Sequence, residues 1–289
     1  MPHPDRPLDQ LADRLPYGHE LDVALEAACE AGEILRRHWQ RGTESWEKSE
    51  DNPVTLADLE ADRAIVARLH TAFPEDGLLS EETVRDPGHS ERRRAWIVDP
   101  MDGTKEFIAR IPEFAVSIAL VEDGEPVVGA ILNPALRVAV FATRGGGSWR
   151  AALDAARPRG SLRDLAQRVA VSGLEHLDQA LLIASRTEIS RDQLSAYAPW
   201  CREIRPVGSI AWKLACIACG EADLNVSVAP KNEWDVCAGD LLVREAGGVY
   251  CAFDGSKRRY NQPDPLIAAG MLAGPPALVD AFLAREARR

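Results

Sequence analysis

The chain has 289 residues, a length that predicts one large domain or two packed ones. Of these residues 46% are hydrophobic and 27% are charged, a composition typical of a globular protein. Its 45 acidic and 34 basic residues give a formal net charge of −11, which argues against binding of a nucleic-acid polymer or an anionic membrane. No stretch approaches the roughly 18 apolar residues that span a bilayer, and no apolar segment follows the charged residues 1–6, so we predict a cytoplasmic protein.

The N-terminal half predicts two helices followed by a sheet. Residues 1–20 are rich in proline and charge and are expected to form a loose arm. Apolar residues at helical spacing predict a helix over 21–39, and Thr55 is a suitable N-cap for a second helix that ends near Phe73. Strands of a mainly antiparallel sheet are predicted at 78–79, 96–98, 115–120, 127–132 and 138–141.

The composition changes after residue 150. Residues 150–165 are rich in Ala, Arg and Pro, which makes this segment the best position for a domain boundary. Beyond it, predicted strands (181–184, 224–228, 266–269) alternate with predicted helices (210–219, 236–246, 277–287). We therefore expect an α+β domain over 21–155 and an α/β domain over 156–289.

Acidic residues follow predicted strands, or begin a predicted helix, at three places. Glu81 and Glu82 follow the strand at 78–79, Asp99 and Asp102 follow the strand at 96–98, and Asp235 begins a helix. Each acid alone has an ordinary explanation as solvated charge, a turn residue or a helix cap. Together they predict carboxylates gathered at the ends of strands, and oxygen ligands without His or Cys favour Mg²⁺ or Mn²⁺.

Divalent ions held by such carboxylates would bind a phosphate group. Two ions can lower the pKa of a bound water and stabilise the leaving oxygen during in-line displacement. The backbone N–H groups of Gly103 and Thr104, at the start of a short helical turn, would meet the phosphate. The residues therefore predict hydrolysis of a phosphate monoester.

From about residue 21 onward the sequence resembles the inositol monophosphatase superfamily, whose members are Mg²⁺-dependent, lithium-sensitive phosphatases. Two motifs carry the resemblance, WIVDPMDGT at 96–104 and WDVCAGDLLVREAGG at 234–248. It implies a layered α-β-α-β-α sandwich of the inositol monophosphatase/fructose-1,6-bisphosphatase type, and it allows a homodimer. The cofactor would be two or three Mg²⁺ ions, with Mn²⁺ as a substitute. The domain over 21–155 would bind the metal, and the domain over 156–289 would bind the substrate.

The resemblance also implies roles for individual residues. The metal ligands would be the carboxylates and one backbone carbonyl of Glu81, Asp99, Met101, Asp102 and Asp235. Catalysis would depend on Glu81 and on a pair that orients the attacking water, Asp58 and Thr104, while Glu82 would support the ligands from behind. The phosphate and the substrate would contact Gly103, Thr104, Lys105, Arg186, Ser209 and Asp235.

Two segments are similar to the 3'(2'),5'-bisphosphate nucleotidase branch of the superfamily. Lys105 follows Gly103 and Thr104, and Arg186 follows a serine; these two cations would hold a second phosphate. The expected reaction is hydrolysis of adenosine 3',5'-bisphosphate, a by-product of sulfate activation, to AMP and phosphate.

The segment before Trp234 departs from this branch. Nucleotidases tend to have an Arg there and inositol phosphatases a Glu, whereas this chain offers Lys231 and Glu233. The segment at 208–213 also spaces its Ser and Lys differently from the nucleotidase pattern. An inositol-1-phosphate or broad sugar-phosphate phosphatase is therefore the close alternative, and a non-catalytic phosphate- or metal-sensing module is the remote one.

Overall fold

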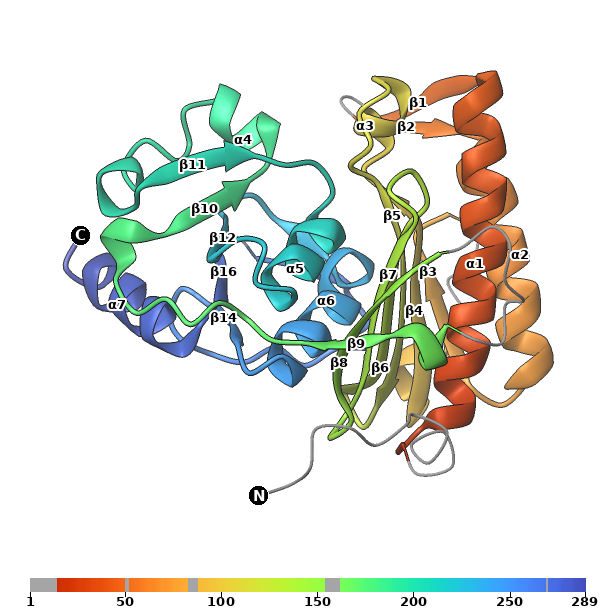
Figure 1. Cartoon of the computed structure of the whole chain (residues 1–289). Coiled ribbons are helices and arrows are strands. Elements are labelled where there is room, and N and C mark those ends of the chain that lie inside the picture. Colours follow the sequence, from red (N-terminus) through yellow and green to blue (C-terminus); the bar gives the residue numbers. More distant parts are fainter. Residues whose placement is uncertain (1–14, 50–51, 83–87, 154–161, 269) are drawn as a thin grey trace.

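The computed structural model describes residues 15–49, 52–82, 88–153, 162–268 and 270–289, which form five alternating layers of helices and sheets (Figure 1). Helices α1 (Gly18–Arg41) and α2 (Leu56–Ala72) cover one face of a seven-stranded sheet. Helices α5 (Ile210–Ala218) and α6 (Glu233–Glu245) lie between this sheet and a five-stranded sheet. Helix α7 (Pro276–Glu286) covers the far face of the second sheet. The predicted α-β-α-β-α sandwich is confirmed.

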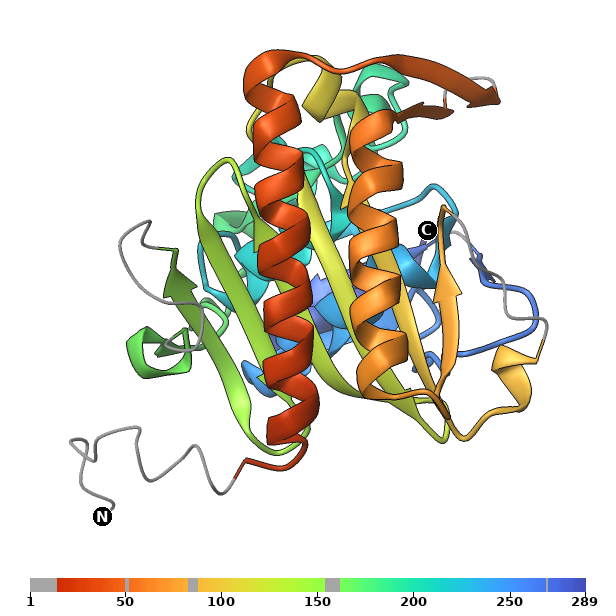
Figure 2. The ribbon, with the colours of Figure 1, turned by 90° about the vertical axis from the view of Figure 1, so that its right-hand side faces the viewer.

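The seven-stranded sheet is antiparallel except at one edge, where β3 runs parallel to β4. Its strands, in spatial order, are β3 (Gly77–Ser80), β4 (Arg94–Asp102), β5 (Ala115–Glu122), β6 (Glu125–Asn133), β7 (Val138–Thr143), β8 (Gly147–Ala152) and β9 (Gln167–Val169). Both faces are buried: Ile118 of β5 packs toward α1 and α2, whereas its neighbour Ala119 packs toward α5 and α6. Figure 2 shows α1 and α2 side by side across this sheet.

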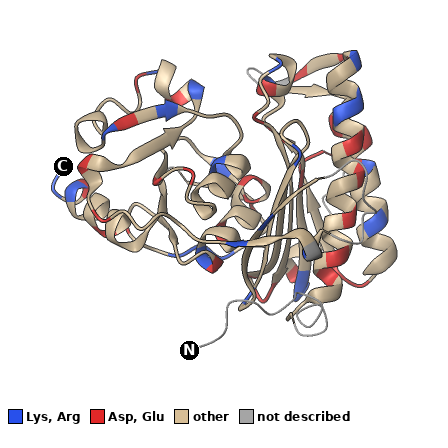
Figure 3. Cartoon of the chain, viewed as in Figure 1, with Lys and Arg blue, Asp and Glu red and all other residues tan. Residues whose placement is uncertain are grey.

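The two long helices follow the sequence signals closely. Helix α1 begins at Gly18, so the predicted arm is shorter than 20 residues; residues 1–14 lie outside the described part. Thr55 caps α2 as predicted, because its Oγ1 accepts a bond from Ala57 N at 3.1 Å and its own N–H donates to Asp58 Oδ2 at 2.7 Å. Charged residues of both signs run along α1 and α2, whereas the sheet beneath carries few (Figure 3).

The second sheet is mixed, with the strands β11 (Glu203–Pro206), β10 (Leu181–Ala184), β12 (Leu224–Ser227), β16 (Met271–Gly274) and β14 (Val249–Ala252) in spatial order. The strand predicted at 266–269 is confirmed at Leu266–Ile267 as β15, which lies outside this sheet. It pairs with β13 (Lys231–Asn232), and the strand next to β12 in this sheet is β16, which the sequence did not predict. The hairpin of β1 (Ser45–Ser49) and β2 (Asn52–Thr55) and the short helices α3 (Thr104–Ile108) and α4 (Arg186–Ser190) complete the fold.

The division into domains at residues 155 and 156 stays a prediction, because residues 154–161 lie outside the described part. Strand β9 pairs with β8, so the first sheet extends to Val169. Over the described ranges, we find no helix with the length and apolarity needed to cross a membrane.

Candidate active site

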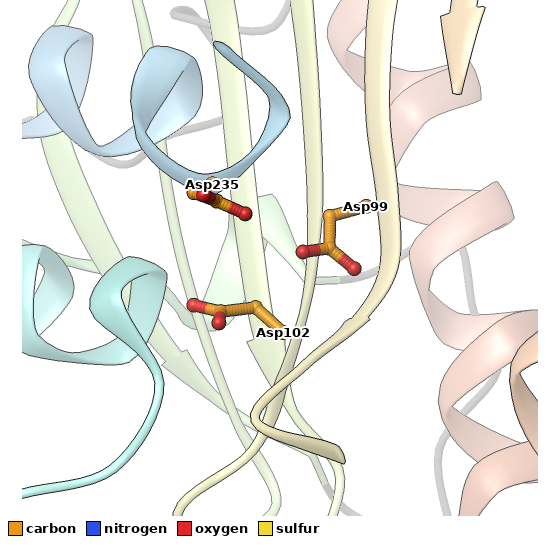
Figure 4. A group of neighbouring side chains, drawn as sticks. All are labelled: Asp99, Asp102 and Asp235. Atoms are coloured by element: carbon orange, nitrogen blue, oxygen red, sulfur yellow. The ribbon is translucent and has the colours of Figure 1, made fainter. Parts of the chain in front are cut away.

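Three aspartates from distant parts of the chain meet between the large sheet and α6. Asp99 and Asp102 lie near the end of β4, and Asp235 lies in the first turn of α6. One oxygen from each carboxylate lies within 4.8 Å of the others, and Figure 4 shows the three side chains directed toward a common space. The structure thus brings together three of the five predicted metal ligands at a distance that one cation could span.

An irregularity in β4 lets both of its aspartates reach this space. Asp99 pairs with Ser117 and Asp102 with Ala115 on β5, so β4 contains one residue more than its partner over this span. On a regular strand, residues three apart would point to opposite faces of the sheet. The bulge, which lies between Asp99 and Asp102 and includes Pro100, therefore turns Asp102 to the same side as Asp99.

Each aspartate is held by hydrogen bonds from the protein. Asp99 Oδ1 accepts a bond from Met101 N at 2.9 Å, and Asp235 Oδ2 accepts one from Asn232 N at 2.7 Å. Asp102 Oδ2 accepts two bonds, from Ser209 Oγ at 2.7 Å and from Ala211 N at 2.6 Å. In each carboxylate one oxygen is fixed in this way, and this orients the other oxygen.

The electrostatics of the cluster favour a bound cation. Burial raises the pKa of Asp99 and Asp235 well above their usual range, and the neighbouring carboxylates of Glu81 and Asp102 raise both further. A divalent cation would relieve both effects because it replaces repulsion with attraction. Among the described residues the cluster consists of carboxylates alone, and such an all-oxygen donor set fits Mg²⁺ or Mn²⁺.

The aspartates lie in the wall of an open cavity of about 480 Å³. Every predicted site residue except Asp58 and Glu82 lines it, namely Glu81, Asp99, Met101, Asp102, Gly103, Thr104, Lys105, Arg186, Ser209 and Asp235. Gly103 has φ +98°, and a Cβ atom there would lie 2.9 Å from the carbonyl oxygen of Glu113, so both conformation and space require glycine at this position.

Asp58 lies behind Thr104 rather than in the cavity wall. Thr104 Oγ1 lies 3.2 Å from Asp58 Oδ1 and 3.3 Å from the carbonyl oxygen of Met101, so its hydrogen can be donated to either. Asp58 Oδ2 accepts bonds from the backbone N–H and the hydroxyl of Thr55. Burial raises the pKa of Asp58 to about 6. The predicted Asp58–Thr104 pair is thus in contact, with Thr104 on the cavity side.

Two predicted substrate contacts also make bonds within the wall of the cavity. Ser209 donates its hydroxyl hydrogen to Asp102, so it orients one of the clustered carboxylates. Arg186 Nη1 donates to Glu113 Oε2 at 2.5 Å and lies 3.5 Å from Glu106 Oε1. These two carboxylates offset the positive charge of Arg186, which was expected from the sequence to bind a second phosphate.

The structure also distinguishes residues that the sequence left undecided. Of Lys231 and Glu233, only Lys231 lines the cavity, because the Glu233 carboxylate accepts bonds from the backbone of Asn261 and Gln262. Lys213 is buried in the cavity wall and donates to the carbonyl of Val207 at 3.1 Å.

Sequence reasoning missed a run of polar residues that line the cavity, among them Thr187, Glu188, Arg191 and Gln193. The Ser-x-x-Glu pattern at 185–188 could have predicted a helix start, because Ser185 caps α4. Nothing in that pattern indicates which surface the helix faces.

Comparison with known proteins adds four findings. The family model for the inositol monophosphatase family matches residues 19–288 of this chain. Nus factor SuhB from Xylella fastidiosa is 35% identical over 239 residues, 82% of each protein. A fructose-1,6-bisphosphatase/inositol-1-monophosphatase from Thermotoga maritima is 29% identical over 255 residues, 87% of this chain and 92% of that protein. The crystal structure of extragenic suppressor protein suhB from Bartonella henselae has a TM-score of 0.77 at 28% identity and covers 92% of this chain and 97% of that one.

Proposed function

The chain belongs to the inositol monophosphatase family, and we propose that it is a Mg²⁺-dependent phosphomonoesterase of the 3'(2'),5'-bisphosphate nucleotidase type. Its substrate would be adenosine 3',5'-bisphosphate, which it would hydrolyse to AMP and phosphate. The observation that carries the proposal is the cluster of Asp99, Asp102 and Asp235 in a cavity whose wall also contains lysines. Metal-binding carboxylates and cations in one cavity suit a substrate with more than one phosphate.

The residues that would hold Mg²⁺ are the four carboxylates and one carbonyl of Glu81, Asp99, Met101, Asp102 and Asp235. Bound Mg²⁺ would neutralise the negative charge of the phosphate oxygens and lower the pKa of a nearby water molecule. The Thr104 hydroxyl, donating to Asp58, has lone pairs left to accept a hydrogen bond from the attacking water. As the water gives up its proton to Thr104 Oγ1, Asp58, with its raised pKa, would accept the hydrogen that Thr104 donates.

Recognition of the rest of the substrate would use the remaining walls. Lys105, Lys213 and Lys231 line the cavity and would bind the phosphate that is not hydrolysed. A second groove, of about 390 Å³, shares Pro53 and Lys105 with the cavity. Trp46 lines this groove and is 45% exposed. An exposed indole ring offers a surface on which a nucleobase can stack.

An inositol-1-phosphate or sugar-phosphate phosphatase is the second candidate. It is favoured by the carboxylates that offset the charge of Arg186 and by the name of the relative from Thermotoga maritima. Phosphate release by the purified chain with Mg²⁺ separates the candidates. We expect kcat/KM for adenosine 3',5'-bisphosphate to exceed the values for inositol 1-phosphate and fructose 1,6-bisphosphate. Comparable values would end the nucleotidase proposal, and no release from any ester would favour the non-catalytic module.

Lys105→Ala is expected to raise KM for adenosine 3',5'-bisphosphate by about tenfold, the effect of losing about 1.4 kcal/mol of binding. KM for inositol 1-phosphate should change much less, because that substrate has no second phosphate to lose a contact. Steady-state kinetics on both substrates checks this, with Lys105→Arg as the control that keeps the charge. An equal rise for both substrates would show that Lys105 does not select the substrate.

The dependence of kcat on pH should report the ionisation of Asp58. Only the ionised carboxylate can accept a proton, and burial raises its pKa to about 6, so kcat should fall as the pH drops below about 6. Asp58→Asn should remove this acid limb and lower kcat by about 10²-fold or more. Measurement of kcat from about pH 5 to 9 at saturating Mg²⁺ checks both effects. An unchanged acid limb in the variant would assign the ionisation to another group.

A further inference from the structure

A buried carboxylate outside the metal cluster joins two parts of the cavity wall. Glu188 lies in α4 and is 2% exposed, and its backbone N–H donates to the Ser185 hydroxyl at 3.0 Å. Its Oε1 accepts three bonds from the last residue of β12 and the segment that follows it: from Ser227 Oγ at 3.0 Å, Val228 N at 2.8 Å and Ala229 N at 2.9 Å. One carboxylate oxygen thus fixes the direction in which this segment leaves the second sheet.

Burial alone would raise the pKa of Glu188, but the N–H of Ala229 and the charge of Lys231 outweigh this effect and hold the pKa below its usual value. The Glu188 side chain is therefore ionised at neutral pH and a strong acceptor for the two backbone amides. A buried ionised group that makes three hydrogen bonds restrains the atoms that donate to it.

The restrained segment leads directly to Lys231. Ala229 is two residues from Lys231, which lines the cavity. The Lys231 Nζ lies 3.5 Å from the carbonyl oxygens of Ala229 and Pro230, too far for strong hydrogen bonds. The position of the ammonium group therefore depends on the path of the backbone, which the pairing of β13 with β15 holds at Lys231 and Glu188 holds just before it, at Val228 and Ala229. Asp235, farther along the chain, is oriented separately, because its carboxylate accepts a hydrogen bond from Asn232 N. Loss of Glu188 should therefore leave the metal cluster unchanged.

We propose that Glu188 is a positioning residue that keeps Lys231 at the cavity wall, where Lys231 binds an anionic group of the substrate other than the phosphate that is hydrolysed. The ligand class is a phosphate monoester with a second phosphate, sulfate or carboxylate. This inference rests on the proposed phosphatase function and extends it to the residues that select the substrate.

The test compares Glu188→Ala and Glu188→Gln, since glutamine keeps a side-chain oxygen that can accept the three bonds. Glu188→Ala should raise KM for adenosine 3',5'-bisphosphate by about tenfold and leave kcat within about twofold. Glu188→Gln should stay near the wild-type value. KM for inositol 1-phosphate should change little in both. Glu203→Ala, which removes an exposed glutamate of the same sheet that pairs with Arg205, is the matched control.

A double-mutant cycle shows whether Glu188 acts through Lys231. Lys231→Ala should raise KM as Glu188→Ala does, and the double variant should be no worse than Lys231→Ala alone. Hydrogen exchange of the Val228 and Ala229 amides should accelerate in Glu188→Ala and not in Glu188→Gln. If Glu188→Ala does not fold, Ser227→Ala removes one of the three bonds and should give a smaller effect in the same direction.

Multiplicative effects in the cycle, equal effects on both substrates, or a large loss of kcat would each overturn the role of Glu188. If the wild-type chain hydrolyses none of the esters, the proposed function fails separately. Calorimetric titration with adenosine 3',5'-bisphosphate then decides the inference. The inference requires Glu188→Ala to weaken binding of adenosine 3',5'-bisphosphate as much as Lys231→Ala does. Unchanged binding in Glu188→Ala, or no binding by the wild type, would overturn the inference.

Discussion

Asp102→Asn should reduce kcat by about 10³-fold or more and leave the fold intact. Asparagine has the same size as aspartate, and its carbonyl oxygen can still accept the bonds from Ser209 and Ala211 that hold Asp102 now. What it loses is the negative charge that would hold a divalent cation beside Asp99 and Asp235. Because the cation would stabilise the charge that develops in the transition state, the loss should appear in kcat.

Phosphate release under saturating substrate and Mg²⁺ measures this effect, and thermal unfolding checks the fold. The matched control is Asp123→Asn, which makes the same change in an exposed turn where Asp123 pairs with Arg93; its kcat should equal that of the wild type. Turnover above about one-tenth of the wild-type value in Asp102→Asn would contradict the assignment of Asp102 as a metal ligand.

Asp99→Asn should make the metal-free protein more stable. Asp99 is 1% exposed, and burial together with the charges of Glu81 and Asp102 raises its pKa well above the usual range. At neutral pH this carboxyl group is therefore destabilising unless a cation is bound. Asparagine removes the charge and can keep the bond from Met101 N. We expect a gain of about 1 kcal/mol or more in the free energy of unfolding, or about 2–4 °C in the midpoint of thermal unfolding.

The raised pKa of Asp99 also makes the stability of the metal-free protein depend on pH. Because the pKa of Asp99 is higher in the folded than in the unfolded state, its effect is absent below about pH 4 and grows as the pH rises through the folded-state pKa. The stability of the wild type in EDTA should therefore fall over this range more than that of Asp99→Asn. Added Mg²⁺ should restore the stability of the wild type, because a ligand that binds only the folded state stabilises it. The stability of the variant should increase less. Thermal unfolding at about pH 5 and pH 7, with EDTA and with Mg²⁺, measures these differences. A less stable variant in EDTA at pH 7 would refute the account.

Local signals in the sequence predicted most of the fold. Helical periodicity predicted α1 and α2, and the capping residue Thr55 fixed the start of α2. The β1–β2 hairpin was missed because its first strand (Ser45–Ser49) is mostly polar and has no apolar alternation to indicate it. The strand predicted at 266–269 forms at Leu266–Ile267, but its pairing with β13 could not be predicted, because an apolar run does not show which strand it will pair with.

Site residues that belong to a sequence motif could be predicted. Site residues that depend on contacts between distant parts of the chain could not. The two motifs place Asp99, Asp102 and Asp235 in the sequence, and the fold brings them together. The bond from Ser209 to Asp102 joins residues 107 positions apart, and no local pattern reports such a contact. The three bonds to Glu188 depend in the same way on how the segment after β12 packs against α4.

We propose that carboxylates from β4 and α6 bind a divalent ion in the cavity. A crystal of the protein soaked in Mn²⁺ tests it most directly, because anomalous diffraction locates manganese independently of the protein atoms. We predict a manganese peak within ligand distance of Asp99, Asp102 and Asp235. Aspartate oxygens directed away from one another, with manganese absent from the cavity or bound only elsewhere, would contradict the account.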